Sequence, residues 1–143
     1  MALWTAGALS ARIAKVQASA EVNVVAALSE VAARIEREAK DAIRASGSHP
    51  RDTPTPAVKG AAPAIITGTL RRSIIHTRPV PAGLLTWQVK VGMAAGVYPP
   101  RGRTPSSKYA LYLETVWGYP FLGPAFTTVT HSVSWRALMG KWV

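Results

Sequence analysis

Apolar positions along the first third of the chain recur with the period of a helix. Between about Ser10 and Ala45, charged side chains fall largely on other faces than the apolar set, which is Val24, Leu28, Val31, Ile35, Ala39 and Ile43. Spacings of four or three residues are typical of an amphipathic helix with one buried stripe. Ser46-Gly47 ends the pattern, because glycine suits a left-handed cap. Small and polar residues at 17–23 leave two arrangements open, one long helix or two stacked pieces.

A period of two replaces the helical period in the middle of the chain. From Leu84 to Gly92 apolar and polar side chains alternate, which is typical of a strand with one buried and one solvated face. A shorter candidate strand, Ile74 to Thr77, precedes it across a segment rich in proline. The pattern therefore predicts an antiparallel hairpin or meander. Just before it, Thr67 is placed to cap a short helix through its side-chain oxygen.

The end of the chain predicts a second amphipathic helix. Pro124 suits the first helical position. The apolar residues that follow recur at helical spacing: Phe126, Val129, Val133 and Ala137, with Leu138 and Trp142 widening the stripe. Arg136 and Lys141 are placed for the negative end of the helix dipole. The preceding block, Tyr109 to Glu114, fits either a helical turn or a short strand.

These elements predict one α+β domain over residues 1–143, a usual size for a single domain. A small antiparallel sheet packs against a long N-terminal helix and a shorter C-terminal helix. Residues 1–46 form the helical region, and residues 67–143 form the sheet and the last helix. Between them, residues 47–66 carry four prolines and predict a long loop. That loop reaches a neighbour, orders on assembly, or is a surface loop with no role.

Charge is distributed unevenly along the chain. The formal net charge is +10, but residues 1–52 hold seven basic and six acidic side chains and so contribute only +1. Residues 53–143 hold ten basic side chains and a single acid, Glu114, and contribute +9. A field of this sign favours polyanions, so contact between the second part and nucleic acid is one expectation; the alternatives are a protein whose charge serves solubility and one that docks on acidic neighbours.

Several classes of function lack the residues that they require. The chain has no Cys, which excludes disulfides, thiolate metal sites and cysteine nucleophiles. Its three His are scattered, the second part has no paired carboxylates, and no glycine-rich phosphate loop is present. We therefore expect no enzyme, no metal site and no cofactor. No apolar run is long enough to span a membrane and no basic start precedes the first apolar cluster, so we expect a protein kept in the cytosol of its producing cell.

Three sets of side chains are candidates for specific contacts. Contact with a nucleic-acid backbone, or salt bridges to adjacent proteins, fits the basic residues Arg71, Arg72, Arg101, Arg103 and Lys108. An intersubunit contact, or packing in the core, fits the aromatic residues Trp117, Tyr119 and Phe121. Glu114 is expected to form a structural ion pair with an arginine, Arg71 and Arg72 being the nearest candidates, with an exposed acid as the alternative.

Three short blocks carry a resemblance to a known family. They are Thr67-Gly68-Thr69-Leu70-Arg71-Arg72-Ser73-Ile74, then Tyr109-Ala110-Leu111-Tyr112-Leu113-Glu114, then Gly118-Tyr119-Pro120-Phe121-Leu122-Gly123-Pro124-Ala125-Phe126. In this order they resemble the head-to-tail joining (neck or tail-completion) proteins of long-tailed phages, a tail-component family similar to lambda-type minor tail protein Z. The resemblance covers nearly the whole chain. The chain departs from the pattern in one step, because three residues separate Glu114 from Gly118 where family members often have fewer.

The resemblance implies a structural protein of the virion neck. It implies a homo-oligomeric ring, expected to hold six copies, that joins the head-closure or adaptor protein to the tail tube or its terminator. Phage DNA passes through such a ring without sequence-specific binding, and the basic residues line the passage or face adjacent rings. The protein is then assembled in the host cytoplasm and resides in the virion. The alternatives are a tail terminator that caps the tube and a basic, non-specific nucleic-acid-binding domain.

Overall fold

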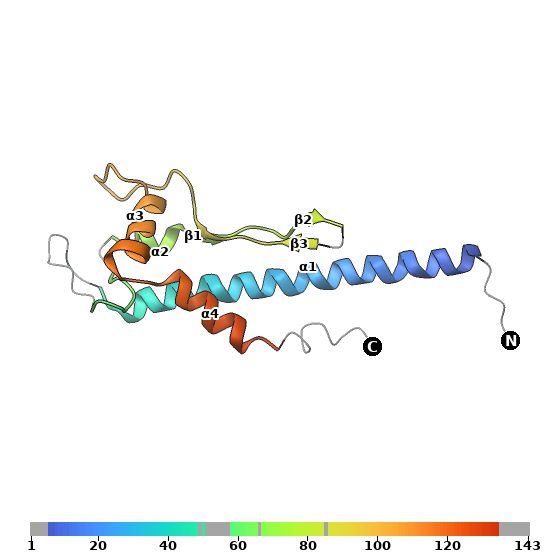
Figure 1. Cartoon of the computed structure of the whole chain (residues 1–143). Helices are drawn as coiled ribbons and strands as arrows, with labels where there is room; N and C mark the ends of the chain where they lie inside the picture. The colour runs from blue at the N-terminus through green and yellow to red at the C-terminus, as the bar shows by residue number, and fades with distance from the viewer. Residues whose placement is uncertain (1–5, 49, 51–57, 66, 85, 135–143) are drawn as a thin grey trace.

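The computed structural model describes residues 6–48, 50, 58–65, 67–84 and 86–134, and it has the expected α+β architecture (Figure 1). Its elements in chain order are α1 (Ala6–Ala45), α2 (Thr69–Ser73), β1 (Ile74–His76), β2 (Val80–Gly83), β3 (Thr86–Gln88), β4 (Val91–Met93), α3 (Ser106–Tyr112), the π-helix η1 (Leu113–Trp117) and α4 (Leu122–Ser132). The strands and α4 lie against different sides of α1, and α2 and α3 lie near its C-terminal end (Figure 1). The long helix is therefore the element on which the others assemble.

Helix α1 is continuous over 40 residues, a length of about 60 Å, so the interpretation as one long helix is correct. Alanine is the strongest helix former, and the many alanines of the outer half favour continuity there. Of the predicted stripe, Val31, Ile35, Ala39 and Ile43 are buried and Val24 and Leu28 are half-buried. Gly47 ends the helix with φ 85°, and its N–H donates to the Arg44 carbonyl at 3.1 Å. This is the left-handed glycine cap that the sequence predicts.

The outer half of α1 extends beyond the rest of the described structure (Figure 1). Every residue from Gly7 to Val22 is exposed except Ala20, which is half-buried. We call residues 7–22 the arm. The side chains of the arm are largely exposed, so its helical conformation draws little on packing and depends on its own sequence and on continuity with the packed half.

The four strands form one long antiparallel hairpin with an interruption. Strand β1 pairs with β4, with Ile74 opposite Met93, and β2 pairs with β3, with Val80 opposite Gln88. Between the two pairs, the Thr77 N–H donates to the Lys90 carbonyl at 2.8 Å. The next position is near Pro79, which has no N–H, and the ladder breaks there.

The alternation predicted from Leu84 to Gly92 is confirmed, although the segment forms two short strands. Its apolar side chains Trp87, Val89 and Val91 are half-buried, and its polar side chains Thr86, Gln88 and Lys90 are exposed. Leu85 lies outside the described residues. The half-buried face packs toward α1, which both β1 and β3 contact.

A small set of polar contacts ties β1 to α1. The expected pairs Glu30–Arg34 and Glu36–Lys40 are both present on α1. The second carboxylate oxygen of Glu36 lies 2.5 Å from His76 Nδ1 on β1. Glu36 therefore links the long helix to the first strand of the hairpin.

The described part of the 47–66 loop is held against the body of the protein. The N–H of Ile65 donates to the Gly47 carbonyl at 2.8 Å, and the N–H of Gly60 donates to the Gly118 carbonyl at 2.7 Å. Ala62 and Pro63 are buried. Residues 49, 51–57 and 66 lie outside the described residues, so the role predicted for the whole loop stays a prediction.

Helix α4 differs from the predicted second helix in its start and its buried face. It begins at Leu122, so Pro124 is its third residue, still within the first turn where N–H groups have no intrahelical acceptor. Ala125 and Val129 are buried, whereas Phe126 is 58% exposed. The predicted positions Arg136, Ala137, Leu138, Lys141 and Trp142 lie outside the described residues.

The largest buried cluster lies where α1, β1, α3, η1 and α4 meet. Its members are Val31, Ile35, Ala39, Ile43, Ala62, Ile74, Ala110, Leu113, Phe121, Ala125, Val129 and Val133. Among the described helices, none combines the length and the apolar character needed to cross a bilayer.

The link between Glu36 and β1 predicts a pH-dependent loss of stability. Desolvation raises the pKa of Glu36, but hydrogen bonds and charge from Lys40 and His76 outweigh it, and the net pKa lies below the usual 4.5. Because the folded-state pKa is the lower one, the stabilisation is complete above about pH 4.5 and is lost as the pH falls through the folded-state pKa. We expect Glu36→Gln to lower the free energy of unfolding in urea by about 1 kcal/mol at pH 7.

The difference between the variant and the native chain should shrink as the pH is lowered from about 5 toward 3. Glu38→Gln is the matched control, since Glu38 is an exposed acid of the same helix, and its effect should stay within about 0.5 kcal/mol. A Glu36→Gln difference that stays constant across this pH range would contradict the assignment.

Candidate functional site

The three blocks that carry the sequence resemblance meet at the C-terminal end of α1. The first block forms α2 and the start of β1, the second forms α3 and the start of η1, and the third opens α4. Helices α2 and α3 contact each other, and each block contributes to the core through buried residues that include Ile74, Leu113 and Phe121. The first block is separated from the second by 34 residues in the sequence, and the fold brings all three into one unit.

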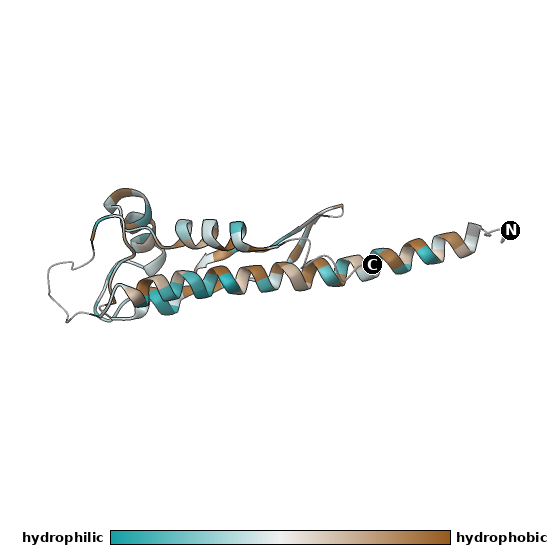
Figure 2. Cartoon of the chain, turned by 90° about the horizontal axis from the view of Figure 1, so that it is seen from below, coloured by the Kyte–Doolittle hydropathy of each residue, from teal (hydrophilic) through white to brown (hydrophobic). Residues whose placement is uncertain are grey.

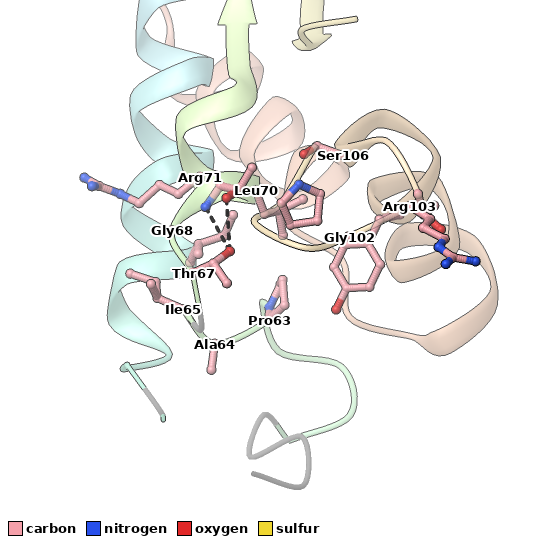
Figure 3. Close-up of a pocket in the computed structure, with 15 residues that line it drawn as sticks. Pro63, Ala64, Ile65, Thr67, Gly68, Leu70, Arg71, Gly102, Arg103 and Ser106 are labelled. Carbon is pink, nitrogen blue, oxygen red and sulfur yellow. Dashed lines mark hydrogen bonds between the residues drawn. The ribbon is translucent and has the colours of Figure 1, made fainter. Parts of the chain in front are cut away.

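The polar positions of the first block have structural partners. The Thr67 hydroxyl accepts the N–H of Thr69 at 3.4 Å, while Gly68 holds the cap position of α2 with φ 71° (Figure 3). The buried Ser73 hydroxyl is 2.9 Å from the carbonyl of Thr69. The cap position therefore belongs to Gly68 and not to Thr67 as predicted, although the Thr67 hydroxyl still accepts the N–H of the first helical residue.

Glu114 corrects a prediction. Its Oε1 accepts the backbone N–H of Phe121 at 2.8 Å, that of Leu122 at a short distance, and that of Gly123 at 3.4 Å. These are the groups that a helix start leaves without intrahelical acceptors, and the positive end of the α4 dipole favours a carboxylate there. Within the described residues, the ion pairs do not include Glu114, so the expected pair with Arg71 or Arg72 is wrong.

Gly118 lies between the carboxylate and the helix that it caps. It has φ 75°, a conformation that favours glycine, and its carbonyl accepts the Gly60 N–H. A Cβ at this position would come within 3.1 Å of the Lys59 side chain. The turn after η1 thus favours glycine at this position of the third block, and a larger residue would also require the Lys59 side chain to shift.

The basic candidates do not form one cluster. Arg71 is half-buried, and its Nε donates to the Lys40 carbonyl of α1 at 3.1 Å, which makes it a structural contact. Arg72, Arg101, Arg103 and Lys108 are exposed. Arg101 and Arg103 lie on the segment that leads into α3, Lys108 lies in the first turn of α3, and Arg101 has φ 61°. The described structure therefore offers four of the five cations to a partner.

The aromatic candidates divide between surface and core. Phe121 is 1% exposed, and Tyr119 is half-buried and packs against the core, so a contact role is wrong for Phe121. Trp117 is 45% exposed and stacks on Tyr112, with ring centroids 5.7 Å apart. It also meets Tyr109 edge to face at 5.6 Å. Burial raises the pKa of Tyr109.

Sequence reasoning missed the partners of Trp117. In an ordinary α-helix, residues five apart do not share a face, but a π-helix brings residues i and i+5 into line. Tyr112 and Trp117 are so related, and η1 aligns them. Exposed Leu111 and Val116 adjoin them in sequence on the same two helices. We call the three rings in contact, Tyr109, Tyr112 and Trp117, the aromatic patch.

A cavity of about 260 Å³ lies between α2 and the loop before α3 (Figure 3). Its lining includes Ile43, Ile65, Leu70, Pro99 and Tyr109. Arg71 and Arg103 come from opposite sides, and their guanidinium groups point away from the cavity (Figure 3). The described lining holds no Asp, Glu, His or Lys, and the described residues contain no group of three metal-ligating side chains.

Comparison of the chain with protein-family models, with curated proteins and with solved structures gave no match.

The cap predicts a stability loss that an ion pair would not. We expect Glu114→Ala to lower the free energy of unfolding by about 1 to 2 kcal/mol, because N–H groups at the start of α4 lose their acceptor. Glu114→Gln keeps an acceptor oxygen and should cost less. Urea unfolding measures both. In a double-mutant cycle that combines Glu114→Ala with Arg72→Ala, we expect the two losses of stability to add. An interaction energy above about 0.5 kcal/mol would instead support an ion pair between Glu114 and Arg72.

The aromatic residues predict different losses of stability, measured by urea unfolding. Phe121→Ala removes a fully buried ring and should destabilise the fold by about 3 to 5 kcal/mol. Trp117→Ala removes a half-exposed ring and should cost about 1 kcal/mol or less. The result that would contradict this division is a Trp117→Ala variant as unstable as Phe121→Ala.

Proposed function

We propose that the chain is a structural subunit of the neck of a long-tailed phage. In this proposal it forms a ring, of six copies by resemblance, that joins the head connector to the tail tube and lets the genome pass. The observation that supports it most is the junction of the three blocks: residues that match the family pattern cap α2, cap α4 and fill the core between them. The pattern therefore corresponds to one folded unit, and its polar residues serve that unit.

The distribution of exposed apolar surface also supports a ring subunit. The arm of α1 and the aromatic patch lie toward opposite ends of the long axis (Figure 1). Two different surfaces on one subunit allow heterologous contacts, in which each copy meets two neighbours, and such contacts close into rings when the rotation permits. Patches of exposed aromatic and aliphatic side chains are typical of protein contacts.

The charge distribution fits a passage for DNA. Arg101, Arg103 and Lys108 are exposed on one segment, and Arg72 is exposed on α2. Cations of this kind attract a phosphate backbone without reading bases. The partners in this proposal are further copies of the chain, a head-closure or adaptor protein, the tail tube or its terminator, and DNA in the lumen. The location is the virion, after assembly in the host cytoplasm.

The net charge of +10 favours a second candidate, a basic domain that binds nucleic acid without sequence preference. A tail terminator that caps the tube is a variant of the first proposal at a neighbouring ring. A ring subunit and a nucleic-acid-binding domain differ in the mass of the species that they form and in how strongly their binding depends on salt. A ring subunit self-associates, alone or with its neighbours, whereas a nucleic-acid-binding domain binds DNA as a monomer with affinity that falls steeply as salt rises.

Light scattering on the purified chain tests the proposal. The mass is measured alone and after mixing with the head-closure and tail-tube proteins of the same virion, at low and high salt. We expect one discrete species several times the 15.2 kDa of the monomer, formed alone or with a neighbour. A monomer that ignores both neighbours and binds duplex DNA only at low salt would replace the ring by the nucleic-acid-binding domain.

A further inference from the structure

The arm of α1 presents apolar residues on two opposite faces. One face carries Leu9, Ile13, Val16 and Ala20, and it continues along the helix into the buried Ala27 and Val31. At 100° per residue, the face on the other side of the helix carries Ala11, Ala14, Ala18 and Val22. We call these the leucine face and the alanine face. Both repeat at spacings of three and four residues, which is the spacing that packs against another helix.

These faces are exposed in the single chain. Leu9, Ile13 and Val16 on the leucine face are 50 to 60% exposed, and Val22 on the alanine face is 68% exposed. Figure 2 shows the hydrophobic positions continuing along α1 toward its N-terminal end, past the elements that pack on it. A row of large apolar side chains in water is the feature expected of a surface covered by a partner.

The charged residues of the arm do not interrupt either face. Arg12, Lys15 and Glu21 lie on the two polar edges between the faces, and they give residues 7–22 a net charge of +1. The segment 53–143, by contrast, has a charge of +9. Bringing two copies together through their arms therefore avoids the like-charge repulsion that contact between the basic surfaces would produce.

The accessible surface of the chain has the size that such a contact needs. The whole chain exposes 9952 Å², whereas a compact folded monomer of this mass exposes about 7,100 Å². The excess is about 2,800 Å². A subunit that makes two ordinary contacts buries about 800 Å² of its own surface in each. The exposed arm is a described part of this excess.

We propose that the partner of the arm is the arm of a second copy of the chain, with the leucine face of one copy seated on the alanine face of the next. Large side chains against alanine let two helix axes approach closely and interdigitate. Because the two faces differ, each arm uses one for each neighbour, and the contact is heterologous, as a ring requires. The closed ring in this inference rests on the proposed function. The inference adds which surfaces of neighbouring subunits meet.

Disulfide trapping tests this contact, since the native chain has no Cys. The full-length double variant Ile13→Cys/Ala18→Cys carries one thiol on each face. The two positions lie about 8.7 Å apart on one helix, too far for a disulfide within the same arm. On mild oxidation, alone and with the head-closure and tail-tube proteins, we expect a ladder of covalent oligomers on a denaturing gel. Each single variant should remain monomeric there.

The matched control is Gln17→Cys/Ser19→Cys, which carries its thiols on the two polar edges and should give no ladder. In light scattering, Ile13→Glu should weaken self-association at least about tenfold, and Gln17→Glu should leave it unchanged.

Other occupants of the leucine face give other results, each of which overturns the inference. A covalent dimer from the Ile13→Cys single variant would mean that two leucine faces meet. Slow alkylation of that thiol in a monomer would mean that another part of the same chain covers the face. A disulfide only to a cysteine of an added neighbour would mean that a different protein occupies it. A ring-sized species that gives no covalent ladder would contradict the arm contact but not the proposed function. A monomer under every condition would contradict both the arm contact and the proposed function.

Discussion

The junction at the C-terminal end of α1 depends on one carboxylate. Glu114 lies on η1, and its carboxylate accepts the first N–H groups of α4. This contact fixes the direction in which α4 returns along the long helix. That direction places Phe121, Ala125 and Val129 in the core with Ile35 and Ile74. The same turn contains Gly118, whose carbonyl accepts the Gly60 N–H, and it follows η1, where Trp117 stacks on Tyr112. A helix start with its acceptor removed would loosen each of these contacts, because they share one turn.

Sequence patterns predicted the elements whose period is regular and whose burial is one-sided. The stripe of α1, its glycine cap and the alternation around Trp87 are all present. The prediction failed where two elements had to meet. Charge alone suggested an arginine as partner for the only acid of the second part, but a helix terminus is an equally good partner for a carboxylate, and only the fold decides which lies closer. Arg71 shows the same limit. Its side chain donates to a backbone carbonyl of α1, a partner that charge alone does not indicate.

The aromatic residues show a second limit of periodicity. Phe121 and Trp117 are four residues apart in one turn segment, yet one is in the core and the other on the surface. The π-helix shifts the register after Leu113, so an α-helical wheel cannot place Trp117 beside Tyr112. The three residues between Glu114 and Gly118 belong to this π-helix. The spacing between Glu114 and Gly118 and the stacking of Trp117 on Tyr112 therefore have one structural origin.

These features describe a body with a capped, well-packed core and exposed apolar surface toward both ends, which is consistent with the proposed ring subunit. Electron microscopy of the purified chain, alone or with the head-closure and tail-tube proteins that the proposal names, tests this account most directly. The account predicts closed rings with a central opening wide enough for a DNA duplex. Isolated monomers, closed dimers without an opening, or protein that is seen only along added DNA would contradict it.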